Sequence, residues 1–467
     1  MRTDCTGDQL EFQGLGRRRV VARFDAGRGS SDGGGTLLLR EVAERTGWLT
    51  GFAGCFGDGR EARRTEHGVE ELVAQRVLGI ALGYEDLNDH ETLRDDALFA
   101  LAVGRPDVTG EQRVRERDRG HALAGKSTLN RLEHGRGERS RYHRIDHDGA
   151  AIAHWITECG LDADAQPERI VLDFDTTDDP LHGHQEGRFF HGYYGGYCYL
   201  PLYVFWGDLL LVAKLQPANQ DAAAGAVEEA ARIVGQIRQR WPEVEIWIRA
   251  DSGFAREALM AWCEANGVEY VLGLARNARL QRAIGRELHE AKERCQEQQE
   301  AARSFVELDY RTRRTWSRQR RVVAKAEWLP GKANPRFVVT SLPAGRFAGQ
   351  ELYEAIYCAR GDMENRIKEQ QLDLFADRTS TATLRANQLR LWFASMAYAL
   401  VAQLRRIGLA GTALARAQAG TIRLRLFKIG AIVRISARRI TVSLSSVYPL
   451  QALFVQVLAN LQRAAPT

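Results

Sequence analysis

The sequence lacks the features that would place it in or across a membrane. It contains no uninterrupted run of about 18 apolar residues, which a membrane-spanning helix requires. Its first residues, from Met1 to Cys5, also lack the apolar segment of a secretory signal peptide. The 7 cysteines are scattered singly without any Cys-x2-Cys pair, so neither a zinc ribbon nor a disulfide framework is expected. We therefore expect a cytoplasmic protein without a membrane partner.

The composition is that of a globular protein without a dominant charge. Of the 467 residues, 44% are hydrophobic and 27% are charged, and a chain of this length exceeds one ordinary core. The net charge of +5 is too small by itself to indicate a nucleic-acid partner. Most of the positive charge is arginine, however, and the arginines are clumped. Arginine clusters suit bidentate contacts with phosphates better than lysine would.

Residues 1–165 are predicted to form a mostly helical DNA-binding region. Apolar residues recur at helical spacing in 37–46, 69–80 and 93–101, and Ser127 is expected to cap a further helix. Short helices with charged outer faces suit a DNA-binding module, and a generic helical bundle suits the same pattern almost as well. Within residues 1–35, Arg17, Arg18 and Arg19 belong either to a mobile DNA-contacting arm ahead of a short strand at 20–24 or to a solvated tail.

Residues 120–127 match the formula of a phosphate-binding loop, Gly-x4-Gly-Lys-Ser. That loop works only between a buried strand and a helix, where its backbone amides can surround phosphates. The preceding residues 111–119 are a charged run, which is not a buried strand. We therefore treat the match as chance and expect no nucleotide cofactor.

The order of elements from residue 166 predicts an α/β fold. Residues 166–275 are expected to contain three antiparallel strands followed by alternating helices and strands, which is the layout of a ribonuclease-H-like core. The expected strands are 170–175, 197–205, 209–215, 245–250 and 268–274, with helices at 219–240 and 254–266.

The remainder is expected to interrupt and then complete that core. Residues 276–345 predict a β-rich insertion with strands at 304–310, 320–328 and 336–341. Residues 346–467 predict the second part of the core. It is expected to contain helices at 351–375, 385–404 and 450–461 and a hairpin within 421–445.

Four carboxylates stand where such a fold could bring acids together. Asp173 and Asp175 lie on the apolar strand at 170–175, Asp251 follows the strand at 245–250, and Glu364 lies among apolar residues in the helix at 351–375. Converging carboxylates repel one another unless cations neutralise them, and oxygen ligands favour Mg²⁺ or Mn²⁺. Asp173 and Asp175 share a strand face, so the pattern alone leaves both open as ligands. For any single acid, a surface salt bridge is the simpler interpretation.

Three stretches together resemble the DDE-type transposases of bacterial insertion sequences, and more narrowly the group 1 transposase DDE domain. They are Leu-Asp-Phe-Asp-Thr-Thr at 172–177, Arg-Ala-Asp-Ser-Gly-Phe at 249–254 and Tyr-x2-Arg-x3-Glu at 357–364. The segment Leu-Gln-Pro-Ala-Asn at 215–219 is also similar to the family, and the likeness covers about residues 36–460.

The resemblance implies roles for particular residues. It makes Asp175, Asp251 and Glu364 the catalytic ligands of two Mg²⁺ or Mn²⁺ ions, with Asp173 as the backup for Asp175. It also implies that Tyr357 and Arg360 meet DNA phosphates.

The family signature often carries a lysine seven residues after the glutamate, where this chain has Gln371. We expect Lys368, one helical turn after Glu364, to take its place.

A second expected DNA contact is the stretch 311–321, in which six arginines surround Trp316. By analogy with related transposases, Trp316 would act as a wedge that stacks on an extruded base. The alternative is a solvated hairpin whose tryptophan packs on its own sheet. The candidate phosphate contacts are Arg313, Arg314, Arg318, Arg320 and Arg321.

The sequence therefore predicts a bacterial, nucleoid-associated transposase that cuts transposon ends and joins them to target DNA. Because two ends must be held together, a homodimer is expected on the double-stranded DNA. A standalone nuclease of the same fold and a catalytically inactive DNA-binding repressor are the alternatives.

Overall fold

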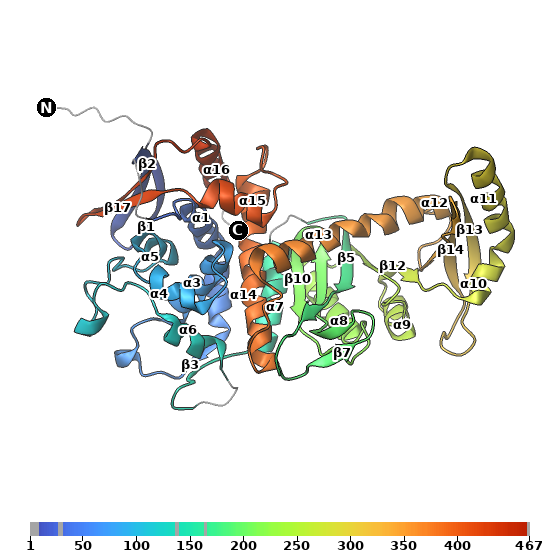
Figure 1. Ribbon diagram of the computed structural model, residues 1–467, viewed down its shortest axis with the longest axis horizontal. Coiled ribbons are helices and arrows are strands. Elements are labelled where there is room, and N and C mark those ends of the chain that lie inside the picture. The colour runs from blue at the N-terminus through green and yellow to red at the C-terminus, as the bar shows by residue number, and fades with distance from the viewer. Residues whose placement is uncertain (1–8, 27–30, 136–139, 163–165, 465–467) are drawn as a thin grey trace. The chain divides into compact units, whose positions relative to one another are not determined.

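The computed structural model describes residues 9–26, 31–135, 140–162 and 166–464 (Figure 1). Its contacts divide the chain into two units. Unit 2 comprises residues 164–182 and 187–367, and unit 1 comprises residues 1–163, 183–186 and 368–467. Each unit mixes helices and strands, so the expected α/β class is confirmed.

Unit 2 is built on one large sheet. Its strands follow the order β10-β9-β5-β11-β12-β16-β14-β13. The bounds are β5 (Arg169–Thr176), β9 (Leu202–Trp206), β10 (Leu209–Lys214), β11 (Glu245–Ala250), β12 (Glu269–Leu274), β13 (Ala302–Tyr310), β14 (Arg320–Leu329) and β16 (Arg336–Thr340). β5, β9 and β10 are antiparallel, as expected, whereas β11 runs parallel to both β5 and β12. The expected strands at 304–310, 320–328 and 336–341 are present and continue this sheet through β16.

Alternation along β5 explains how this sheet is covered. Ile170, Leu172 and Phe174 are fully buried on one face, while Val171 on the other face packs beside Trp247. The second face is covered by a helical segment that begins with α12 (Gly349–Glu351) and includes α13 (Gly361–Lys368), shown in orange along the strands in Figure 1. Helix α9 (Glu257–Ala265) contacts β12 and α8 (Ala226–Arg240). α10 (Ala278–Ala283) precedes α11 (Gly285–Gln298), which packs on β13 and β14.

Two predicted elements of unit 2 differ in their bounds. The strand expected at 197–205 is divided at Pro201 into β8 (Gly196–Tyr199) and β9, and β8 pairs with β6 (Asp179–Pro180) and β7 (Phe189–His191). The long helix begins at Ala226, not at residue 219, because Gly225 precedes it at φ +71°. That left-handed conformation ends the helical path.

Unit 1 packs its helices around α14 (Leu384–Gln403), which is buried along most of its length. α14 contacts both α3 (Val69–Ala81) and α7 (Gly149–Asp162). The other helices are α1 (Thr36–Thr46), α2 (Trp48–Gly54), α4 (His90–Leu93), α5 (Ala97–Val103), α6 (Lys126–Glu133), α15 (Ala419–Ile422) and α16 (Gln451–Arg463). Helix α6 begins at Lys126 after an N-cap at Gly125, so the expected cap at Ser127 is wrong. The loop before it follows a short 3-10 turn, Glu116–Asp118.

A four-stranded sheet joins the two ends of unit 1. Its order is β1 (Leu10–Leu15), β2 (Arg18–Ala26), β18 (Arg439–Ser445) and β17 (Ala431–Ile435). The arm expected near the N-terminus is thus a hairpin over these residues, and 1–8 and 27–30 lie outside the described part of the chain. The hairpin expected within 421–445 is present at its C-terminal half, but 419–427 is helical. A second small sheet pairs β3 (Phe56–Asp58) with β4 (Ile145–His147).

Across the described residues, we find no helix of the length and apolar character needed to cross a lipid bilayer.

Glu133, the last residue of α6, is fully buried in unit 1. Its carboxylate accepts hydrogen bonds from Arg76 Nε of α3 at 2.6 Å and from Arg390 Nε of α14 at 2.8 Å. Burial alone would raise the pKa of Glu133, but the two guanidinium groups outweigh it and lower that pKa. One carboxylate therefore holds three helices together.

Replacing Glu133 with glutamine should destabilise unit 1 strongly. The change leaves two buried guanidinium groups without their counter-charge, which costs about 3 kcal/mol of unfolding free energy. Urea denaturation followed by tryptophan fluorescence measures it. Glu111→Gln, at an exposed position of unit 1, serves as the control and should change the value by less than about 0.5 kcal/mol. Equal effects of the two substitutions would contradict the role of Glu133.

Candidate active site

Asp175 and Asp251 stand level at the ends of two neighbouring parallel strands. Ala250 of β11 is the register partner of Phe174 of β5, so the next residue on each strand is one of these acids. The backbone N–H of Thr176 donates to Asp175 Oδ1 at 3.0 Å, and that of Gly253 donates to Asp251 Oδ1 at 2.8 Å. These bonds fix both carboxylates at one edge of the sheet, as the sequence predicted.

Asp173, the alternative first acid, has a different partner. Arg249, its register partner on β11, donates Nε to Oδ1 at 2.5 Å and Nη2 to Oδ2 at 2.8 Å. Burial raises the pKa of Asp173, and the bidentate bond to Arg249 opposes that rise. One guanidinium therefore takes both oxygens of Asp173 in a bidentate ion pair, while Asp175 has a different partner.

Glu364 lies in the first turn of α13, and its side chain is 50% exposed. The expected helix at 351–375 follows a continuous helical path whose winding changes. It is π-helical at Leu352–Tyr357 and Glu369–Asp373 and has a 3-10 turn at Cys358–Arg360. Glu364 thus lies midway along this helical path, as expected, but its side chain is half exposed. Such changes of winding are frequent at functional sites.

Arg360 joins two of the three predicted ligands. Its Nη1 donates to Asp175 Oδ2 at 2.8 Å, and its Nη2 donates to Glu364 Oε1 at 3.1 Å. Its guanidinium therefore lies between the strand that carries Asp175 and the helix that carries Glu364. Burial lowers the pKa of Arg360, and the surrounding acids, Asp175 foremost, more than reverse this effect.

Tyr357 lies against the turn that follows β11, where Gly273 of β12 makes room for it. A Cβ atom at Gly273 would lie 2.5 Å from the Tyr357 hydroxyl and 2.9 Å from the backbone nitrogen of Ser252. Burial raises the pKa of Tyr357, with the charge of Arg360 opposing the rise and that of Asp251 adding to it. Sequence reasoning missed Gly273, although a glycine inside a strand signals that another group approaches closely.

Burial and neighbouring charges both act on the carboxyl group of Asp175. Burial raises the pKa of Asp175 from 3.8 to about 6, against the attraction of Arg360 and with a further contribution from Asp251. A buried carboxylate with a raised pKa and a second carboxylate beside it is typical of a cation-binding position.

The donor set fits a hard divalent cation, because each predicted ligand offers carboxylate oxygen. Within the described ranges, however, no three His, Cys, Asp or Glu side chains are grouped closely enough to hold a metal ion. Asp175 and Asp251 are brought together, whereas Glu364 is bonded to Arg360.

The basic stretch between β13 and β14 divides into exposed and buried arginines. Arg313, Arg314 and Arg318 are exposed. Arg320 is buried and bonded to Glu257 and Glu264, at 2.6 and 2.7 Å for the shortest contacts. Its donors are therefore occupied within the protein.

Arg321 and Trp316 also belong to the protein's own packing. Arg321 binds Glu307 at 2.8 Å and two backbone carbonyls. Trp316 is only 5% exposed, and its ring packs edge-on against Tyr310. Arg320, Arg321 and Trp316 are thus structural residues, and the expected exposed wedge is replaced by a tryptophan that packs on its own hairpin.

The other predicted DNA contacts lie outside this cluster. Lys368 is exposed at the end of α13, four residues after Glu364. Arg17 is exposed in the turn of the β1–β2 hairpin, Arg18 donates to the Pro106 carbonyl at 3.1 Å, and Arg19 pairs with Glu11 at 2.8 Å. These three arginines belong to unit 1.

A comparison with protein families decides what kind of protein carries this site. The profile of the family described as "Transposase DDE domain group 1" matches residues 12–466, nearly the whole chain. The chain belongs to this transposase family. The resemblance stated from the motifs is confirmed, and DNA is the substrate that the family implies. A search of curated proteins found no match.

Replacing Asp175 of this DDE transposase with asparagine should stabilise the fold at neutral pH. An ionised carboxylate whose folded pKa is about 6 costs stability above that pH, and the cost disappears below about pH 4, where folded and unfolded states are both protonated. Asparagine carries no charge and avoids this cost. We therefore expect the free energy of unfolding of Asp175→Asn to be higher by about 1–3 kcal/mol at neutral pH, and this difference should vanish on acidification. Urea denaturation in the presence of EDTA measures it.

Asp362→Asn, at an exposed position of α13, is the matched control and should have little effect at either pH. An unchanged or lower stability of Asp175→Asn at neutral pH would mean that the bond to Arg360 fully offsets burial.

Replacing Gly273 with alanine should destabilise unit 2 by about 1–3 kcal/mol, because the added methyl overlaps the Tyr357 hydroxyl. Adding Tyr357→Phe removes that hydroxyl, so the double variant should lose less than the sum of the two single changes. The contact with Ser252 remains, and the relief should be partial. Gly235→Ala in α8, where a Cβ would meet nothing within 4 Å, is the control. If the losses of unfolding free energy in the two single variants simply added in the double variant, the Tyr357 hydroxyl would not lie against Gly273.

Proposed function

We propose that this chain is the transposase of a bacterial insertion sequence, which binds the terminal inverted repeats of its element and catalyses DNA cleavage and strand transfer. The observation that carries the proposal is the convergence of three separate segments. Asp175 and Asp251 end adjacent parallel strands, and Arg360 bonds Asp175 to Glu364. Membership of the transposase family supports it.

The catalytic core of the proposal is a ribonuclease-H-like fold in unit 2. Its support is the antiparallel set β10-β9-β5 followed by the parallel strands β11 and β12, with α8 between β10 and β11 and α9 between β11 and β12 along the chain. In open sheets of this kind, ligands bind outside the carboxyl ends of the parallel strands, where Asp175 and Asp251 lie.

Asp175, Asp251 and Glu364 hold two Mg²⁺ or Mn²⁺ ions in the proposed reaction. When bound, such ions activate a water or 3′-hydroxyl and stabilise the leaving oxygen of a phosphodiester. The chain's own groups position the DNA. Arg360 can exchange its bond with Glu364 for a bidentate bond to a phosphate, and Tyr357 beside it can donate to the same backbone.

Further contacts with DNA come from exposed cations. Arg313, Arg314 and Arg318 in the β13–β14 loop, Lys368 on α13 and Arg17 on the β1–β2 turn meet phosphates of the transposon ends or target. The enzyme works as a homodimer on DNA, because two ends are processed together, and its setting is the bacterial cytoplasm and nucleoid.

The decisive experiment follows Asp251→Asn on labelled transposon ends and a target plasmid with Mg²⁺. Loss of one ligand should lower both cleavage and joining by roughly 1,000-fold, equivalent to about 4 kcal/mol of transition-state stabilisation, while DNA binding persists. Glu243→Gln is the matched control. Glu243 is an exposed acid shortly before the first residue of β11, at the end of the strand opposite Asp251. The activity of the Glu243→Gln variant should therefore equal that of the wild type.

Each other outcome contradicts part of the proposal. Wild-type cleavage without joined products would indicate a standalone nuclease. Specific binding without cleavage would indicate an inactive repressor. Undiminished cleavage by Asp251→Asn would refute the three-carboxylate assignment.

A further inference from the structure

Helix α6 of unit 1 presents one polar face to solvent. Lys126, Ser127, Asn130 and Arg131 are exposed, at a spacing that places them on one side of the helix, whereas Leu129 and Leu132 are buried on the other. These exposed residue types are the ones that read base edges in DNA. Arginine and lysine pair with guanine, and asparagine pairs with adenine.

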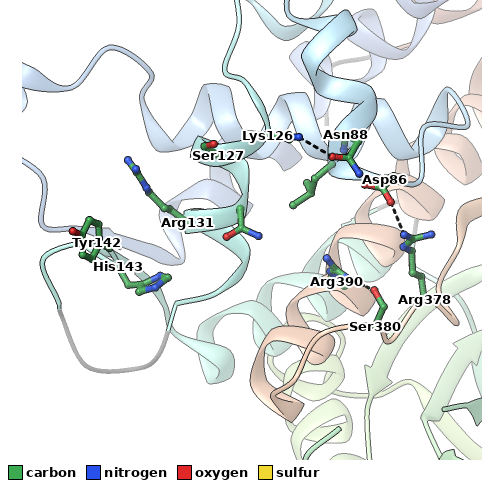
Figure 2. Close-up of a pocket in the computed structure, with 12 residues that line it drawn as sticks. Asp86, Asn88, Lys126, Ser127, Arg131, Tyr142, His143, Arg378, Ser380 and Arg390 are labelled. Carbon is green, nitrogen blue, oxygen red and sulfur yellow. Dashed lines mark hydrogen bonds and ion pairs between the residues drawn. The ribbon is translucent and has the colours of Figure 1, made fainter. Parts of the chain in front are cut away.

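Two polar grooves flank this helix, and Ser127 and Arg131 line both of them. The first groove, shown in Figure 2, is a pocket of about 540 Å³ between α6, the loop with His143, and the segment that carries Arg378 and Arg390. Among the described residues it is lined by four cationic side chains and one carboxylate. Arg378 is bonded to that carboxylate, Asp86, at 2.7 Å.

The second groove, on the other side of α6, has a volume of about 660 Å³. In the described part of the chain, eight arginines and four carboxylates line it. Arg64, Arg115, Arg117 and Arg144 are exposed there. The second groove therefore presents more exposed positive charge than the first, in which Arg378 and Arg390 are paired with Asp86 and Glu133.

The helix is held rigidly in this position. Glu133 at its end is bonded to Arg76 and Arg390, as described above. At its start, the backbone N–H of Lys126 donates to Glu91 Oε1 at 2.8 Å. In the preceding loop, Gln75 exchanges hydrogen bonds with the backbone of Ala124 at 2.8 and 3.2 Å. A side chain can discriminate bases only when its backbone is fixed in this way.

We propose that α6 is the base-reading helix of this protein, which enters the major groove of double-stranded DNA while the two flanking grooves receive the sugar-phosphate backbones. The major groove admits one α-helix and is bordered by one backbone on each side, which matches a helix between two guanidinium-lined grooves. Asn130 and Arg131 read bases, and Arg115 and Arg144 hold phosphate. The proposal rests on the proposed function and names the element that recognises the transposon ends.

Double-stranded RNA fits this surface less well than DNA does. The major groove of an A-form helix is deep and narrow, so side chains on α6 could not reach its bases. The Gly-Lys-Ser letters that imitate a phosphate-binding loop also find a role here, since Lys126 and Ser127 open the reading helix.

The test is selection from a library of random DNA duplexes by the full-length protein, followed by fluorescence anisotropy on the enriched duplex and on a shuffled one. Asn130→Ala and Arg131→Ala should each weaken binding to the enriched duplex by about 5- to 100-fold and leave the shuffled duplex almost unaffected. Arg115→Ala combined with Arg144→Ala should weaken both duplexes equally and reduce the salt dependence by about one phosphate contact per arginine. Arg286→Ala, on the exposed face of α11, is the control.

Thermal unfolding of each variant checks that it is folded. Unchanged motif and affinity in both Asn130→Ala and Arg131→Ala would overturn α6 as the reader and leave the proposed function intact. Equal losses of affinity for the enriched and the shuffled duplex in Asn130→Ala and Arg131→Ala would also overturn base reading by α6. Preference for an RNA duplex of the same sequence, or a wild type that enriches no motif, would overturn this proposal. A wild type that enriches no motif would also contradict the recognition of transposon ends in the proposed function. The experiment with Asp251→Asn tests DNA cleavage and joining separately.

Discussion

One partly buried guanidinium, that of Arg249, bonds together the three segments that carry Asp175, Asp251 and Glu364. It binds Asp173, two residues before Asp175, and it lies two residues before Asp251 on its own strand. Its third nitrogen donates to the carbonyl of Ile356 at 2.5 Å, on the helical path that continues to Arg360 and Glu364. A one-residue slip of β5 against β11 would break this pair and turn Asp175 to the opposite face. The ion pair therefore specifies register, although a buried pair is weak evidence of added stability.

The site beyond that pair is arranged for binding at some cost in stability. Asp175 is buried beside Asp251, and its raised pKa is the physical sign that the charge is not fully balanced by Arg360. Glu133 is compensated more fully, because two guanidinium groups contact it directly and its pKa is lowered despite burial. Active sites commonly hold such imbalance because an unsatisfied group is free to bind a ligand. On the same strand face, Asp173 has both oxygens bonded to Arg249, whereas Asp175 shares Arg360 with Glu364.

Strand ends and their acids could be predicted from the sequence because the signal is local. The apolar residues of β5 and β11 mark buried strands, and a carboxylate directly after each marks the end. The role of Asp173 was not predictable in this way, since its partner Arg249 lies 76 residues away along the chain. The same limit applies to the N-terminal hairpin, whose strand β2 pairs with β18 near the other end of the chain. Glu364 was placed on a helix correctly, but its environment depends on changes of winding that apolar spacing does not reveal.

Charge sorting explains why the net charge gave little indication of a DNA partner. The sequence has nearly as many acidic as basic residues, yet the two kinds serve different surfaces. In unit 2, carboxylates gather at the strand ends, while Arg320 joins β14 to α9 and Arg321 joins β14 to β13. In unit 1, exposed guanidinium groups flank α6, and buried Glu133 holds that helix from beneath. An arginine cluster in the sequence is therefore not by itself a DNA contact. Exposure distinguishes the two cases. Arg320 and Arg321 use their N–H donors in bonds to other groups of the protein. Arg115, Arg131 and Arg144 are exposed at the surface, where a phosphate or a base can bind them.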